Sequence, residues 1–374
     1  MTNGSSPKLY IAGMGMVTPV GGNVAMTAAA VNAGISAYQT SRYSNQQGEF
    51  ITMTGVPDTI FFESAAEIDE GIWYSELHDH IIKMAIIAVK EACAQQSLEQ
   101  PIPIIMGMPE VLPNVKHISA SSLIKNLVNN CQPFLNSQQS RSIHSGRASG
   151  MEALEFAFSY LYDSPNAFML VGGSDSYRNY TRLRPLGAAG RLSVAGSTDS
   201  FAPGEAAGFL LLTRYPEFAQ VRNGHMIALN RPSIADEPGH LYSEGPYRGD
   251  GLDQAFKKAL IGQQEKSIHS IYSSMNGENH WAKEYGVAFL RNRKAFQDPV
   301  RFEHPADCYG DLGSATSSVL IALAAEHLFK STKAKAHLVY SSSDTAKRGA
   351  IVVEKILVAA SAPQTNNNPH FGNS

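Results

Sequence analysis

Short apolar runs alternate with longer amphipathic stretches along almost the whole chain, and this alternation constrains the fold more than any other feature. The pattern is typical of a β-sheet covered by helices, and it argues against a sandwich or a helical bundle. The runs form two comparable series, which predicts a duplicated α/β body. The expected strands are Leu9–Met14, Ile102–Met106, Arg141–His144, Phe168–Val171 and Gly208–Leu212, then Met226–Leu229, Ser270–Ser274, Val300–Glu303, Ala336–Tyr340 and Ala350–Val353.

Between these runs, apolar residues recur at helical spacing, most clearly over His80–Ala94. Gly150–Tyr162, Asp253–Leu260 and Ser314–Phe329 have similar patterns and are predicted to be core helices. Leu186–Gly204 is rich in small residues and has no period, which predicts an ordered surface loop. We expect two halves, residues 1–222 and 223–360, followed by a polar, mobile tail over residues 361–374.

The composition limits the classes of function. A chain of 374 residues with 43% hydrophobic content can bury a large core. Its net charge of -3 and the lack of a Lys/Arg cluster argue against a nucleic-acid footprint or an anionic-membrane surface, so we expect a protein or small-molecule partner. No run is long enough to span a bilayer, and the start of the chain lacks a signal-peptide pattern. A cytoplasmic protein is therefore expected.

Cysteine usage agrees with a reducing compartment. Cys93, Cys131 and Cys308 are an odd number and lie far apart, so neither a disulfide framework nor a zinc site is predicted. No metal and no cofactor is expected.

Several segments, in order along the chain, resemble landmarks of the β-ketoacyl synthases of the thiolase superfamily. Residues 142–150, Ser-Ile-His-Ser-Gly-Arg-Ala-Ser-Gly, look like the turn that carries the nucleophile in that family. Tyr272–Gly277 and Tyr309–Ala315 fall where its two histidine motifs belong. The remaining similar segments are Ile11–Gly21, Ala167–Ser174 and the Gly-Glu-x-x-Gly loop within Ala202–Phe209.

The resemblance implies a five-layer α-β-α-β-α fold of two similar halves, with the active site where they meet. It also implies a dimer through the strand before the nucleophile turn. The partner would be a second copy or a catalytic ketosynthase, with acyl carrier protein as a further candidate partner.

Residues at the matching catalytic positions differ from those of the family. Arg147 stands in place of the nucleophilic cysteine, and a guanidinium cannot form a thioester. Asn276 and Gly310 stand in place of the two histidines. Pro305 matches the usual lysine, and Ser341–Lys347 replaces the glycine-rich oxyanion loop. An alternative interpretation makes Arg147 a solvated surface residue outside any site.

Substitute groups for the missing chemistry are few. Cys308 lies near the second lost histidine, but free cysteines are most often inert and buried. His144 and His280 could each supply a base, yet no oriented nucleophile accompanies them. Ser145 and Ser149 flank Arg147 without a Gly-x-Ser-x-Gly turn.

A cation at the start of a helix is unfavourable unless an anion compensates it. The loops that lost their histidines contain acids, and Asp311 is the expected partner of Arg147, with Glu278 second. An ion pair would then fill the space of the acyl thioester. The sequence therefore favours a non-catalytic ketosynthase-like protein that acts as a binding, scaffold or chain-length-factor-like partner. The alternative is an acyltransferase or 3-oxoacyl synthase-related enzyme with a rearranged site.

Overall fold

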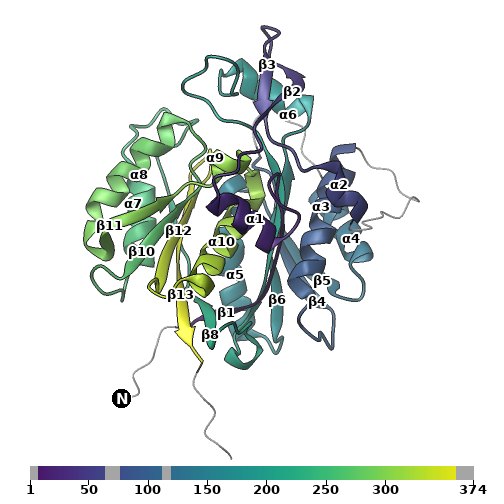
Figure 1. Ribbon diagram of the computed structural model, residues 1–374, viewed down its shortest axis with the longest axis vertical. Helices are drawn as coiled ribbons and strands as arrows, with labels where there is room; N and C mark the ends of the chain where they lie inside the picture. The colour runs from purple at the N-terminus through teal and green to yellow at the C-terminus, as the bar shows by residue number, and fades with distance from the viewer. Residues whose placement is uncertain (1–6, 64–75, 112–118, 359–374) are drawn as a thin grey trace, which may run out of the picture.

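The computed structural model describes residues 7–63, 76–111 and 119–358. Within them, a mixed sheet of eleven strands folds around two central helices (Figure 1). Its first half contains β5 (Leu135–Ile143), β4 (Ile102–Gly107), β6 (Phe168–Ser176), β7 (Glu205–Thr213) and β1 (Leu9–Val17). Its second half contains β8 (His225–Leu229), β13 (Lys347–Leu357), β12 (Ala336–Ser342), β10 (Ile268–Ser273) and β11 (Phe296–Glu303), with β9 (Ser233–Asp236) paired to β13.

The two halves of the sheet are joined at one place. β1 pairs antiparallel with β7 along its length and with β8 only at Leu9 and Tyr10. Beyond this short seam the halves diverge, which makes room for α5 (Ser149–Asp163) and α10 (Thr316–Lys330) between them. β5 and β11 are the outermost strands of the two halves.

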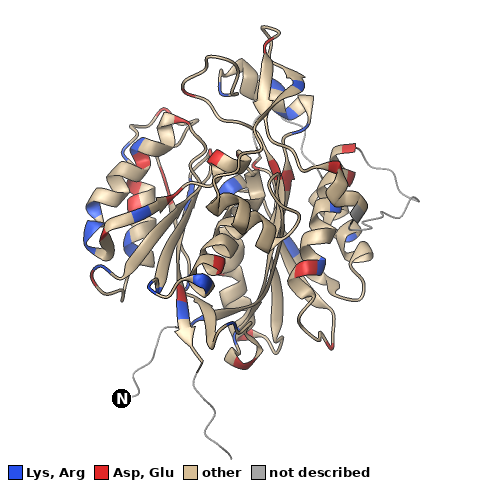
Figure 2. Ribbon diagram, viewed as in Figure 1, with Lys and Arg blue, Asp and Glu red and all other residues tan. Residues whose placement is uncertain are grey.

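The central helices pack closely because small residues face each other. A Cβ at Gly150 would lie 2.6 Å from the Ser317 Cβ, so only glycine allows this approach. α10 buries almost every side chain, since it contacts strands of both halves. That position explains its run of serine, alanine and leucine, and its few charged residues lie towards its C-terminal end (Figure 2).

Outer helices complete five layers. α3 (Glu76–Cys93) and α4 (Ala120–Asn130) cover the first half of the sheet, and α7 (Asp250–Ala259) and α8 (Asn279–Arg291) cover the second. The apolar stripe of α3, including Ile81, Ile82, Ala85 and Val89, is fully buried. The other helices are α1 (Val24–Asn32), α2 (Asp58–Glu63), α6 (Tyr180–Ala188) and α9 (Ala306–Tyr309).

A small cap stands above one end of the sheet, at the top of Figure 1. It consists of the hairpin β2 (Gln39–Ser44) and β3 (Phe50–Met53) together with α6. Its own apolar cluster includes Tyr43, Ile51, Leu183, Leu192 and Phe201.

Several predicted boundaries were wrong. β5 begins at Leu135, well before the predicted Arg141, because its polar middle has no alternating pattern. The segment 186–204 is more than a surface loop, since α6 extends to Ala188 and Leu192 and Phe201 are buried in the cap. The division at residue 222 stays a prediction, and the expected tail, residues 361–374, lies outside the described residues.

Candidate functional site

Arg147 stands at a tight turn between β5 and α5, which we call the first elbow (residues 145–149). Gly146 has a φ of +52°, a conformation that favours glycine, and a 3-10 turn over Gly146–Ala148 leads into α5. The turn directs the Arg147 side chain into the interior, where only 4% of the residue is exposed. The interpretation of Arg147 as a solvated surface residue is therefore wrong.

Each nitrogen of the Arg147 guanidinium donates a hydrogen bond. Nη1 lies 2.6 Å from Asp311 Oδ2, Nη2 lies 2.6 Å from Asp344 Oδ1, and Nε donates to the Ser342 carbonyl at 2.9 Å. The group also stacks over the Trp281 ring, 4.5 Å from its centroid. Burial alone would lower the pKa of Arg147, but Asp311 and Asp344 raise it above its ordinary value, so the side chain stays a cation.

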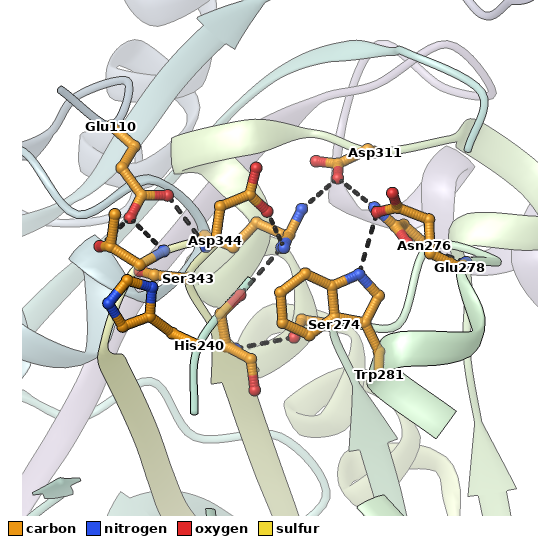
Figure 3. A network of polar contacts seen from close by, with 12 residues as sticks. Glu110, His240, Ser274, Asn276, Glu278, Trp281, Asp311, Ser343 and Asp344 are labelled. Atoms are coloured by element: carbon orange, nitrogen blue, oxygen red, sulfur yellow. Dashed lines mark hydrogen bonds and ion pairs between the residues drawn. The ribbon is translucent and has the colours of Figure 1, made fainter. Parts of the chain in front are cut away.

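Asp311 and Asn276 meet beside this cation (Figure 3). Asn276 Nδ2 donates to Asp311 Oδ2 at 2.9 Å and to Glu278 Oε2 at 3.1 Å. The other Asp311 oxygen accepts from the Gly313 N–H at 2.8 Å. Asn276 thus keeps a polar contact, but its donors are directed at acids of the protein itself.

Gly310 has no room for a side chain. Its φ is +73°, and a Cβ would lie 2.6 Å from the Ala202 carbonyl oxygen. A histidine at this position would need a different backbone conformation, because both the dihedral angle and the close contact exclude it.

A second buried arginine lies across the same acids. Arg191 binds both oxygens of Glu278, at 2.7 and 2.9 Å, and both oxygens of Asp344, at 2.7 and 3.2 Å. It also donates to the Tyr242 hydroxyl at 2.9 Å. Glu278, the second expected partner of Arg147, is thus held by Arg191 and accepts from the Trp281 indole at 3.1 Å.

The rim of the site is closed by Glu110, which accepts from the backbone N–H groups of Asp344 and Thr345 at 3.0 and 2.9 Å. Burial and the nearby Asp344 raise the pKa of Glu110. Burial would also raise the pKa of Asp344, but Arg147 and Arg191 hold it below its usual range. We call this set the arginine network: Arg147, Arg191, Asp311, Asp344, Glu278, Glu110, Asn276 and Trp281.

The sequence did not indicate Arg191 and Asp344. Asp344 is the carboxylate within Ser341–Lys347, the segment that replaces the oxyanion loop, so its position next to the site could have been inferred. Arg191 lies in a segment without periodicity, and nothing in the sequence marks it. Its guanidinium lies 5.3 Å from the centroid of the Phe201 ring, which belongs to the apolar cluster of the cap.

None of the substitute groups belongs to the arginine network. Cys308 is buried, and burial raises the pKa of its thiol, which disfavours the nucleophilic thiolate. Burial and Arg348 lower the pKa of His280 to about 4. His144 is half-buried at the end of β5, and Ser145 donates its hydroxyl proton to Glu152. Ser149 makes a long contact of 3.5 Å with the Ser314 carbonyl.

Two further observations concern the described part of the chain. No group of three or more His, Cys, Asp or Glu side chains in it could hold a metal ion. None of its helices has the length and apolarity needed to cross a membrane.

Solved structures similar to this chain include several ketosynthases. The ishigamide ketosynthase/chain length factor superposes with a TM-score of 0.69 at 15% identity, over 94% of this chain and 99% of that chain. A type II polyketide synthase acyl-carrier protein in complex with its ketosynthase gives 0.72 at 15% identity, over 94% and 99%. The oxazolomycin ketosynthase domain KS7 of Streptomyces albus JA3453 gives 0.74 at 11% identity, over 94% and 75%.

No family model and no curated protein sequence matches the chain. At these low identities the structural likeness concerns the fold. The predicted thiolase-like α-β-α-β-α fold is confirmed.

Proposed function

We propose that this chain is a non-catalytic ketosynthase-like protein that acts as a chain-length-factor-like partner or scaffold. The observation that supports this most is the buried Arg147 guanidinium, which is bound by two carboxylates at the position that the resemblance assigns to the nucleophile. The volume of an acyl thioester is occupied by side chains that bind one another. A cysteine, which would form the thioester, is absent from this position because Arg147 occupies it.

Two details of the arginine network strengthen this proposal. The donors that could stabilise a developing oxyanion, Asn276 Nδ2 and the Gly313 N–H, are both directed at Asp311. The backbone at Gly310 excludes a histidine in its present conformation. Restoring a cysteine alone would therefore leave the site without its other catalytic groups.

The proposed partner is a catalytic ketosynthase that pairs with the β5 edge, and the two outer strands differ in a way that supports this choice. β11 contains Pro299 together with Asp298 and Arg301, and proline and charges on an outer strand oppose pairing with another chain. β5 has no proline, and Arg141 is its one charged residue. The ishigamide ketosynthase/chain length factor and the carrier-protein complex among the similar structures agree with a partner of this kind.

An assay of the purified chain tests the missing chemistry. With malonyl and acyl carrier-protein thioesters, the chain alone and its Arg147→Cys variant should both fail to condense. Condensing turnover that survives replacement of Cys93, Cys131 and Cys308 would contradict the proposal and favour an enzyme with a rearranged site.

A pair of matched variants tests the interface. Ser137→Lys with Gln138→Lys places charges on exposed positions of β5, and Gln297→Lys with Asp298→Lys places them on a half-buried and an exposed position of β11. Sedimentation of each variant with and without a catalytic ketosynthase should show that only the β5 variant loses association. Equal loss for both variants, or for neither, would contradict the β5 interface.

A further inference from the structure

A polar groove lies between the hairpin β2–β3, the helices α2 and α3, and the start of α6. It consists of two adjoining cavities of about 560 and 640 Å³. The cavities share Arg42, Tyr43, Asp58 and Arg178, so we call the pair the Arg178 groove. No residue of the arginine network lines either cavity.

A fully buried carboxylate fixes one wall of the groove. Glu205 accepts from the Val56 N–H at 2.8 Å, from Ser176 Oγ at 2.6 Å and from Arg178 Nη1 at 3.3 Å. His80 Nε2 lies 2.9 Å from Glu205 Oε2, the oxygen that also accepts from Ser176, and it donates because an ionised carboxylate can only accept. Glu205 thereby fixes the positions of His80 and Arg178.

The groove offers cationic donors that the protein leaves largely unused. Arg178 directs one N–H at Glu205, and the side chain remains 34% exposed. Lys83, on the wall of the larger cavity, forms no ion pair within the described part of the chain. Arg42 lies over the Tyr43 ring, and its guanidinium is 4.0 Å from the exposed Glu76 carboxylate.

The same groove also offers an unused acceptor. Asp79 lines the larger cavity, and its Oδ1 atom is buried without a hydrogen-bond partner among the described residues. A buried carboxylate oxygen without a donor is costly, so a donor on a ligand would satisfy it. Asp58 and Glu76 add further negative charge on the same walls.

We propose that the Arg178 groove binds a small zwitterionic molecule with a carboxylate and an ammonium group. Arg178 and Lys83 bind the carboxylate, and Asp79 accepts from the ammonium group. A simple anion would be repelled by the three acids, and a simple cation by the three cations, whereas a zwitterion satisfies both sets. Each cavity has the size typical of a small-molecule site.

A matched set of probes tests the pairing of charges. Glycine, β-alanine and 4-aminobutyrate carry both groups, propionate carries the carboxylate alone, and propylamine carries the ammonium alone. Calorimetric titration at pH 7 should show at least one zwitterion binding about tenfold more tightly than propionate and propylamine, or better. Equal affinity for all five probes overturns the proposal. So does the absence of binding of every zwitterion at a concentration of about 10 mM.

Two variants assign the charges to their residues. Lys83→Ala should weaken the zwitterion and propionate alike, and Asp79→Asn should remove the preference for the zwitterion over propionate. Asp79→Asn removes a buried carboxylate oxygen that has no hydrogen-bond partner among the described residues, and Lys83 forms no ion pair with them, so neither variant should melt below the wild type. Arg293→Ala and Asp298→Asn, an exposed pair far along the chain, should leave binding unchanged. Zwitterion binding that tolerates both groove substitutions would refute the assignment.

Discussion

The two halves of the molecule contain the same local device at the starts of their central helices. Gly146 at the first elbow and Gly313 at the second elbow (residues 312–316) have φ values of +52° and +53°, and each begins a 3-10 turn that leads into a central helix. The side chains differ. The first elbow has a cation at the helix start, whereas at the second elbow Asp175 Oδ2 accepts from the Ser314 N–H at 2.9 Å.

This difference explains where the acids of the site come from. An anion at a helix N-terminus is stabilised by the peptide dipoles, so Asp175 and Asp311, which accept from the Ser314 and Gly313 N–H groups, suit the second elbow. A cation in the same position is unfavourable, and Arg147 therefore requires carboxylates from other segments, Asp311 and Asp344. Each elbow is completed by acids from the opposite half, which ties the halves together across their shared interior.

The largest effect should follow from removing the cation at the first elbow. Arg147→Met leaves Asp311 and Asp344 buried with one positive charge fewer, and breaking a buried pair in this way costs about 3–5 kcal/mol. Urea unfolding at pH 7 measures the loss. If the loss arises from unpaired carboxylates, adding Asp311→Asn to the variant should recover part of it. A variant as stable as the wild type would show that the ion pairs contribute nothing net.

The difference between the two elbows could be predicted from the sequence only in part. It indicated that Arg147 occupies a helix start and that Asp311 lies nearby, because both fall in segments with strong family resemblance. The positions of Asp344 and Arg191 depend on how the β12–β13 loop and the cap pack. The periodicity of the sequence does not indicate that packing. Gly310 was visible in the sequence, but the close contact with Ala202 that forbids a side chain there exists only in the fold.

The halves should also differ in their response to acid. His337 on β12 is fully buried, and burial and His327 lower its pKa to about 2. His327 on α10 has a pKa lowered to about 4 by burial and Arg301, and burial also lowers the pKa of His269. Both nitrogens that face each other, His327 Nδ1 and His337 Nε2, lie 2.8 Å apart.

Because these folded-state pKa values lie below the ordinary value of 6.5, stability is complete above pH 6.5 and falls as the pH drops. The unfolded chain takes up protons that the folded chain refuses, so His337 alone costs about 2 kcal/mol by pH 5. Urea midpoints from pH 7 to pH 5 measure this slope. His337→Leu should flatten the slope, whereas exposed His304→Leu should not. An unchanged slope in His337→Leu would place the acid sensitivity elsewhere.

The smallest expected effect is the difference in stability between two variants, each of which adds one methyl group to the glycine of one elbow. Alanine at either glycine must adopt a positive φ, which costs roughly 1–2 kcal/mol in both cases. The surroundings then differ, because a Cβ at Gly146 would lie 3.1 Å from the flexible Glu110 side chain, whereas one at Gly313 would lie 2.0 Å from Asp175 Oδ2. Gly313→Ala must therefore displace the carboxylate that accepts from Ser314, and Gly146→Ala need only shift Glu110. We expect Gly313→Ala to be less stable than Gly146→Ala by about 1 kcal/mol, the usual net value of one hydrogen bond.

Parallel urea titrations of the two variants measure the difference, and Asp175→Asn in each background shows whether it arises at that carboxylate. If Gly146→Ala proves the less stable variant, then Glu110 and the loop it holds closed matter more to the first elbow than Asp175 does to the second.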